Sequence, residues 1–156
     1  MTSANAHPAA AAAAADQELP SRLRLAITRM ARRLRQQSGT DLGPSQVAAL
    51  ATIDRHGPLA PSELAQREWI KRPTATRILS RLLEAGLAER VQDPSDGRAA
   101  IVTATGEGRA LLRRLRQRKT AYLATRLREL PAEDVETLAR AADVLERLLE
   151  EEGERA

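Results

Sequence analysis

This sequence of 156 residues contains no cysteine and no phenylalanine, and Trp69 and Tyr122 are its only tryptophan and its only tyrosine. The lack of cysteine excludes disulfide bonds, cysteine-ligated zinc sites and thiol redox sensors. With so few aromatics, a hydrophobic core has to be built from Leu, Ile, Val and Ala, which favours packed helices. A chain of this length is sufficient for one domain with its own core.

Motifs that mark enzymes and membrane proteins are missing as well. The only histidines are His7 and His56, too few for a histidine-rich metal cluster. There is no Gly-rich phosphate loop, HExxH motif or nucleophile elbow, so we predict a protein that is not an enzyme and uses no metal or cofactor. No apolar run approaches the roughly 20 residues of a membrane span. Residues 1–17 lack the basic start and strong apolar segment of a signal peptide, and we expect a cytoplasmic protein.

Charge is distributed unevenly along the chain. The net charge of +4 is small, so its distribution says more about partners than its total. Residues 22–35 and 109–128 contain arginines and no acid, whereas the tail from Glu133 onward is mostly acidic. The opposed segments either attract one another, within or between subunits, or are solvated helix faces, because exposed ion pairs contribute only about 0–1 kcal/mol.

Apolar spacing predicts a mainly helical protein. We expect residues 1–17 to be a disordered tail or a frayed helical extension, followed by a helix at about 18–39. Shorter helices are predicted from about Pro44, Pro61 and Lys71, then a long helix from Thr105 and a last helix after Pro131. The first and last helices carry narrow apolar stripes, namely Leu23, Ile27, Met30 and Leu34, and Val135, Leu138, Ala142, Leu145 and Leu149. Such a seam should pack on the rest of the protein or on a partner.

A single hairpin interrupts the helices. Two short runs flank a polar tip at 93–97, directly after the predicted helix–turn–helix of residues 61–86. That order is typical of a winged helix-turn-helix. We therefore predict a mainly α fold with a small β-hairpin wing, as one domain over 18–156. Its winged helix-turn-helix core spans about 44–104, and dimerisation helices span about 18–39 and 105–152.

The predicted fourth helix has one apolar face and one cationic face. Ala75, Ile78, Leu79, Leu82 and Leu83 lie together at helical spacing. The opposite side and the N-terminus carry cations and hydroxyls, with no acid before Glu84. Lys and Arg attract phosphates, and Arg and Thr can read base edges. The candidate DNA contacts are Lys71, Arg72, Pro73, Thr74, Thr76, Arg77, Ser80 and Arg81. A merely solvated amphipathic face is the alternative.

The hairpin tip supplies a second set of candidate contacts, Asp96, Gly97 and Arg98. Gly97 permits the positive φ that a projecting turn needs. Arg98 on a thin projection can enter a narrow minor groove, and Asp96 can brace its guanidinium. The alternative is that Asp96 and Arg98 only stabilise the turn.

The run from Leu59 to Leu112 resembles the DNA-binding core of the MarR family (multiple antibiotic resistance regulators). The matching pieces are "SELA", "PTATRILSRLLEAGL" and the wing "DPSDGRA", closed by "VTATGEG". Family members typically show Asp-x-Arg in the wing, then a strand and Thr-x-x-Gly. The resemblance implies a homodimer that binds pseudo-palindromic double-stranded DNA operators. Thr76 and Arg77 would then be recognition-helix contacts and Arg98 the minor-groove contact, braced by Asp96. The chain departs from the family at Lys71 and Ala60, where small hydroxyl residues are common.

The resemblance further implies a repressor that a small-molecule or other signal releases. Family members often bind phenolic or other amphipathic effectors between the dimer layer and the DNA-binding lobe, where we expect Met30 and aliphatic side chains. Two alternatives stay open: a helical dimeric protein–protein interaction module, and a ligand-binding protein without DNA activity. The acid-free cationic face of residues 74–81, together with Arg98, is the feature that favours DNA.

Overall fold

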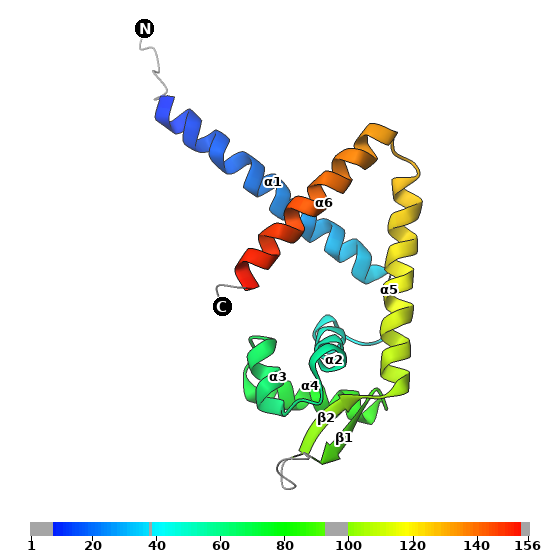
Figure 1. Ribbon diagram of the computed structural model, residues 1–156. Helices are drawn as coiled ribbons and strands as arrows, with labels where there is room; N and C mark the ends of the chain where they lie inside the picture. The colour runs from blue at the N-terminus through cyan, green and yellow to red at the C-terminus, as the bar shows by residue number, and fades with distance from the viewer. Residues whose placement is uncertain (1–7, 38, 93–99, 154–156) are drawn as a thin grey trace.

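The computed structural model describes residues 8–37, 39–92 and 100–153. Within these ranges the chain forms six helices and one two-stranded antiparallel sheet, in the order α1, α2, α3, α4, β1, β2, α5, α6 (Figure 1). The predicted fold class, mainly helical with a hairpin wing, is confirmed. None of the helices in the described ranges is long and apolar enough to cross a membrane.

Helix α1 spans Pro8–Gln36 and begins about ten residues before the predicted start. Residues 9–15 are all alanine, the strongest helix former, and Pro8 suits the first turn of a helix. Of the two expectations for residues 1–17, a helical extension is therefore the one that applies from Pro8 onward. The chain leaves α1 through Gly39, which adopts a φ of +57°, a conformation that favours glycine.

The winged lobe consists of residues 44–104 and the first half of α5, a helix that spans Gly106–Leu127. It contains α2 (Pro44–His56), α3 (Pro61–Arg67), α4 (Arg72–Glu84), β1 (Ala88–Gln92) and β2 (Ala100–Ala104). Side chains from all three helices and from both strands share one core, and Leu112 of α5 joins it. Its largest fully buried side chains are Leu50, Ile53, Leu64 and Leu82. The core is aliphatic, as the lack of aromatics predicts.

The wing is an antiparallel pair in which Ala88 faces Ala104 and Gln92 faces Ala100. Leu59 extends this pair, because its N–H donates to the Val102 carbonyl at 3.0 Å and its carbonyl accepts from the Val102 N–H at 2.8 Å. Local sequence patterns do not predict this bridge, since it joins residues far apart in the chain. It ties the segment before α3 to the base of the wing.

The end of α4, the wing and the start of α5 meet at one junction. Gly86 has a φ of +68° and ends α4 in a Schellman motif, in which Leu87 N–H donates to Leu82 O at 2.9 Å. Thr105 is the N-cap of α5: its Oγ1 accepts from Gly108 N–H at 3.0 Å and donates to Gly86 O at 2.8 Å. "TGEG" is therefore a helix start, as predicted.

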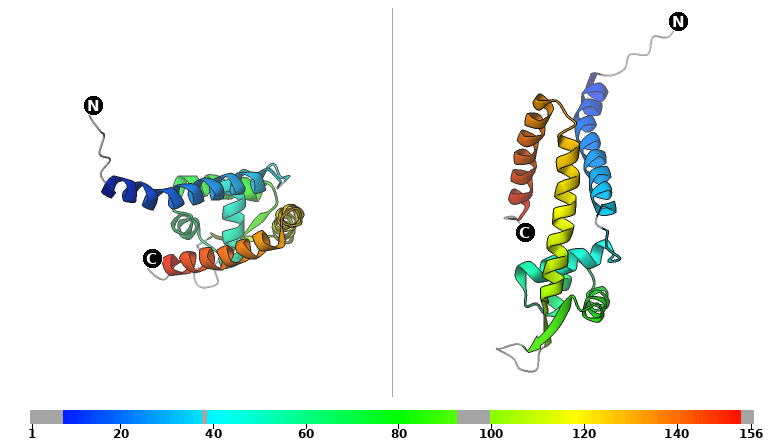
Figure 2. Two further views of the ribbon diagram at one scale, coloured as in Figure 1. Left: turned by 90° about the horizontal axis from the view of Figure 1, so that it is seen from above. Right: turned by 90° about the vertical axis from the view of Figure 1, so that its right-hand side faces the viewer.

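The arm consists of α1, α6 (Ala132–Gly153) and the second half of α5. Helix α5 runs from the lobe into the arm. Figure 1 shows α1 and α6 extending to the same side of α5, away from α4 and the wing, and the right-hand view of Figure 2 shows α5 between them. Much of the predicted apolar stripes is exposed: Leu23, Ile27, Met30, Leu138 and Leu149. The arm of a single chain therefore presents apolar surface that the chain itself does not cover.

Candidate DNA interface

Helix α4 separates its side chains as predicted. Ala75, Ile78, Leu79 and Leu82 are buried, and Leu83 is half-buried against the same core. This burial fixes the rotation of the helix about its axis, so the other side faces solvent. Ser80 is half-buried, and the remaining candidates are exposed: Lys71, Arg72, Pro73, Thr74, Thr76, Arg77 and Arg81. The structure thus brings all eight candidates of α4 and its N-cap to one helix.

The exposed face of α4 keeps its cations free for a ligand. In the part of the chain that the structure describes, Lys71, Arg72, Arg77 and Arg81 form no ion pair. No carboxylate of the described residues competes with phosphates for these side chains, which strengthens their attraction for a polyanion. The face is therefore suited to approach nucleic acid.

Thr76 is oriented by its own helix. Its hydroxyl donates to the Arg72 carbonyl at 3.1 Å, the i−4 bond that Thr often makes within helices. The oxygen keeps acceptor capacity. Such a Thr can accept from a base N–H or contact a thymine methyl, the two interactions that Thr makes in a major groove.

The N-terminus of α4 lacks a side-chain cap. Lys71 is the N-cap residue with extended backbone, and no side-chain hydrogen bond is made there, which agrees with the departure from the family noted at this position. The neighbouring helix α3 shows half of a capping box: Ala60 N–H donates to the Glu63 carboxylate at 2.7 Å. Ala60 has no side chain to reciprocate.

The turn between α3 and α4 contains a feature that sequence reasoning missed. Trp69 adopts a φ of +53° and is 88% exposed. A non-glycine residue in this conformation costs about 1–2 kcal/mol. Ile70, not Trp69, packs against the core, so the larger apolar side chain is the one that points to solvent.

The tip of the wing, with Asp96, Gly97 and Arg98, lies outside the described residues. The two strands that carry it are described and lie at the end of the lobe opposite the arm (Figure 1). The candidate contacts Asp96, Gly97 and Arg98 thus remain predictions from the sequence.

A cavity of about 410 Å³ lies at the junction of arm and lobe. Its size is within the range of small-molecule sites. Aliphatic side chains, one hydroxyl and two cations line it. The lining residues are Arg35, Thr40, Leu42, Pro44, Val47, Ala48, Ala51 and Lys119. Met30, which we expected to line the pocket, is not among them and is exposed on α1. Because Arg35 follows Met30 by more than one helical turn, the junction meets a later part of α1 than predicted.

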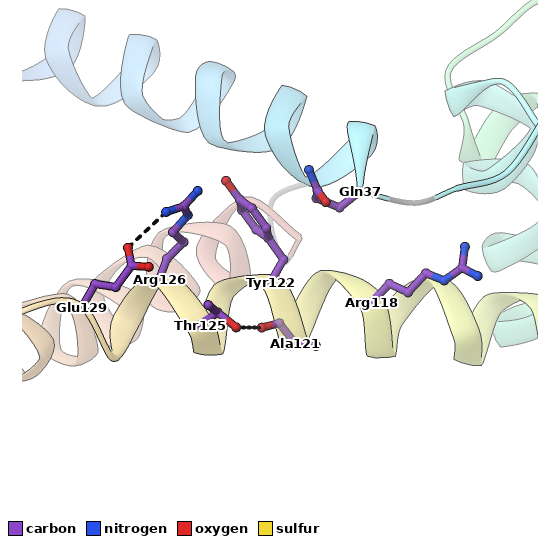
Figure 3. Close-up of a pocket in the computed structure, with 7 residues that line it drawn as sticks. All are labelled: Gln37, Arg118, Ala121, Tyr122, Thr125, Arg126 and Glu129. Atoms are coloured by element: carbon purple, nitrogen blue, oxygen red, sulfur yellow. Dashed lines mark hydrogen bonds and ion pairs between the residues drawn. The ribbon is translucent and has the colours of Figure 1, made fainter.

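A second cavity, of about 710 Å³, lies between α1 and α5 in the arm (Figure 3). Within it, the Arg126 guanidinium lies 5.6 Å from the centre of the Tyr122 ring and forms an ion pair with Glu129 at 3.0 Å. The hydrogen bond with Tyr122, followed by that with Glu129, raises the pKa of Arg126. Among the described residues, no group of three or more His, Asp or Glu side chains is placed to hold a metal ion.

Comparison with known proteins places these features in a family. The model of the MarR family matches residues 42–100, which run from just before α2 into β2. The HTH-type transcriptional regulator Mb0904 of Mycobacterium bovis, described as uncharacterized, is 34% identical over 137 residues, covering 87% of this chain and 96% of that protein. The multiple antibiotic resistance protein MarR of Salmonella typhimurium is 33% identical over 102 residues, covering 65% of this chain and 71% of that protein.

Solved structures agree over nearly the whole length. The crystal structure of a transcriptional regulator protein from Pseudomonas aeruginosa has a TM-score of 0.78 and 31% identity, covering 86% of this chain and 96% of that one. A mutant of S. aureus MepR bound to an oligodeoxyribonucleotide has a TM-score of 0.66 and 21% identity, covering 83% of this chain and 97% of that one. At 21% identity, the likeness to MepR shows that the two proteins share a fold.

Proposed function

The chain belongs to the MarR family of DNA-binding transcriptional regulators, and we propose that it is a homodimeric repressor that binds a pseudo-palindromic operator. The resemblance noted from residues 59–112 is confirmed. Members of this family are transcriptional regulators and not enzymes. We also propose a cytoplasmic location, where the DNA of its bacterial relatives lies.

The observation that carries the DNA-contact proposal is the exposed, acid-free face of α4. Burial of Ala75, Ile78 and Leu79 turns Arg77 outward, and no described carboxylate pairs with it. Arg is the side chain best suited to bidentate contact with guanine. The likeness of fold to MepR, solved bound to an oligodeoxyribonucleotide, supports DNA as the ligand. The second helix of a helix-turn-helix is the one that lies in the major groove, and α4 holds that position here. No observation in the described residues favours a protein–protein module or a ligand-binding protein without DNA activity.

The uncovered arm supports a homodimer. Ile27 on α1 and Leu148 on α6 are 50% and 55% exposed, and a second copy is the partner whose arm has matching stripes. The acidic α6 and the basic α1 also complement each other in charge. We propose one domain over 18–156, in which the core at about 44–104 binds DNA and the helices at about 18–39 and 105–152 dimerise. Two copies of α4 would then enter successive major grooves, about 34–36 Å apart.

Release from DNA by a small molecule is supported by the cavity at the junction of arm and lobe. Its aliphatic wall and its two cations, Arg35 and Lys119, suit an amphipathic anion such as a phenolic acid. A ligand there would change the angle between arm and lobe, and with it the spacing of the two recognition helices.

Selection of DNA fragments by the purified protein, followed by mobility-shift assays, tests this proposal. A palindromic consensus is expected from the selection. Arg77→Ala should weaken operator binding by about 1–3 kcal/mol, roughly 5- to 150-fold, mostly at one base position. Arg140→Ala removes the same charge from α6 and should leave affinity unchanged. Equal affinity of the Arg77→Ala variant and the parent protein would contradict the assignment of α4.

The wing and the dimer have separate tests. Arg98→Ala should weaken operator binding while gel filtration still shows a dimer. A monomer instead would mean that the wing supports the structure. Ile27→Asp, in the exposed stripe of α1, should convert the dimer to a monomer and abolish tight operator binding. Repression itself is tested by transcription in vitro from a promoter that overlaps the operator, where added protein should lower the transcript.

A further inference from the structure

The only tryptophan of the chain lies in the turn that leads into α4. Trp69 is 88% exposed, the highest value among the large hydrophobic residues described as exposed. Its φ of +53° falls in a region that L side chains rarely adopt. Backbone outliers of this kind gather at functional sites, where the surrounding structure holds them in place.

The fold does not need the indole. The turn is held by its backbone: Trp69 N–H donates to Gln66 O at 3.2 Å and Ile70 N–H donates to Ala65 O at 3.0 Å. Ile70 supplies the apolar contact with the core. Glycine would give the same turn without strain. Packing within the chain therefore does not explain why an indole stands at this position.

The surroundings of the indole favour a polyanion. Arg67, Lys71 and Arg72 are exposed cations within three residues of Trp69. The acid of this turn, Glu68, is half-buried and accepts a hydrogen bond from the Thr52 hydroxyl. An indole has a donor N–H and no acceptor, which matches a phosphate oxygen, and its apolar face matches a deoxyribose.

We propose that Trp69 is a DNA-contacting residue, whose indole packs on the sugar-phosphate backbone beside the N-terminus of α4 and donates its Nε1–H to a phosphate oxygen. The proposal rests on the proposed function, since it requires α4 to lie against DNA. A backbone contact positions the protein without reading sequence. Trp69 should therefore contribute equally to binding of every duplex, in contrast to Arg77.

Fluorescence provides a direct test because all tryptophan emission comes from this residue. Titration of the parent protein with its selected operator should shift the emission and lower the acrylamide quenching constant at least about twofold, as burial removes the indole from water. An indole as accessible in the saturated complex as in the free protein would overturn the proposal.

Trp69→Gly separates DNA contact from folding. Glycine suits the φ of +53°, so this variant should unfold at the same temperature as the parent or higher. Its affinity should fall about 10- to 150-fold, as loss of a hydrogen bond to a charged group predicts. The loss should be equal for the operator and for a scrambled duplex of the same composition. Trp69→Phe keeps an aromatic ring and loses the N–H donor, so its DNA affinity should lie between those of the parent protein and Trp69→Gly.

Salt dependence distinguishes the indole from its charged neighbour. Trp69→Gly should leave the slope of log affinity against log salt unchanged. Lys71→Ala should reduce the slope by about 1.8 for the dimer, which is about 0.9 for each of its two Lys71 side chains. Full DNA affinity in Trp69→Gly would overturn the proposal while operator binding stands. Loss confined to the operator would mean base reading and also overturn it. If the parent protein selects no DNA, the proposed function fails as well.

Discussion

Replacing Gly108 with alanine should destabilise the protein, because this glycine lies where α5 meets the end of α4. A Cβ at position 108 would lie 2.1 Å from the Leu87 carbonyl oxygen and 3.2 Å from Leu50 Cδ1. Real Cβ atoms essentially never approach a heavy atom closer than 3.0 Å. The backbone of α5 or of Leu87 therefore has to move by about 1 Å, since a carbonyl cannot rotate aside as a side-chain end can.

The magnitude follows from three contributions. Overpacking of this kind costs about 1–3 kcal/mol, and a backbone clash belongs in the upper half of that range. The movement also breaks the hydrogen bond from Thr105 N–H to Leu87 O, 3.1 Å long, at about 1 kcal/mol. Alanine regains about 1 kcal/mol of helix propensity. The net loss is about 2–3 kcal/mol, or about 4–12 °C in melting temperature for a chain of this length.

Gly106, two residues earlier in the same turn, provides the matched control. A Cβ there meets nothing within 4 Å, so Gly106→Ala should leave the melting temperature unchanged or raise it slightly. Thermal unfolding followed by circular dichroism measures both, at one protomer concentration because a dimer melts in a concentration-dependent way. Equal melting temperatures for the two variants would refute the close approach of α5 to Leu87.

Three further substitutions test the lobe. Thr105→Val removes both hydrogen bonds of the N-cap hydroxyl and should lower the free energy of unfolding by about 1–3 kcal/mol in urea titrations; a change below about 0.5 kcal/mol would contradict the capping role. Leu82→Ala, at a side chain that is 0% exposed, should cost about 2–5 kcal/mol by the same measurement, and a smaller loss would mean that the core repacks. Arg116→Ala breaks an ion pair with Asp54 of 3.5 Å whose Arg is 67% exposed, so stability should change by no more than about 1 kcal/mol and less in high salt.

The recognition face could be predicted from the sequence because it depends on local geometry. Ala75, Ile78 and Leu82 recur at helical spacing, so their burial turns Arg77 outward wherever the helix is placed. Gly86 likewise marks the end of α4 through its own backbone preference. The aliphatic core and the order of helix, turn, helix and hairpin follow from composition and chain order.

Contacts between distant segments could not be predicted in this way. The bridge between Leu59 and Val102, the closeness of Gly108 to Leu87 and the lining of the cavity beside Arg35 each join residues that no local pattern relates. Their formation depends on how whole elements pack, which periodicity does not encode.

The turn at Trp69 shows most clearly the difference between what local sequence predicts and what tertiary packing decides. Apolar side chains usually lie inside a folded protein, and no local pattern marks Trp69 as an exception. In the structure its backbone is left-handed, and Ile70 is the residue of this turn that packs against the core. The sequence by itself thus determined the helices, their apolar faces and the cationic face of α4, because those properties belong to each segment alone. Which apolar residues are covered and which stay in solvent, Trp69 and the stripes of the arm included, was decided only by the tertiary structure, because burial depends on what the neighbouring segments already fill.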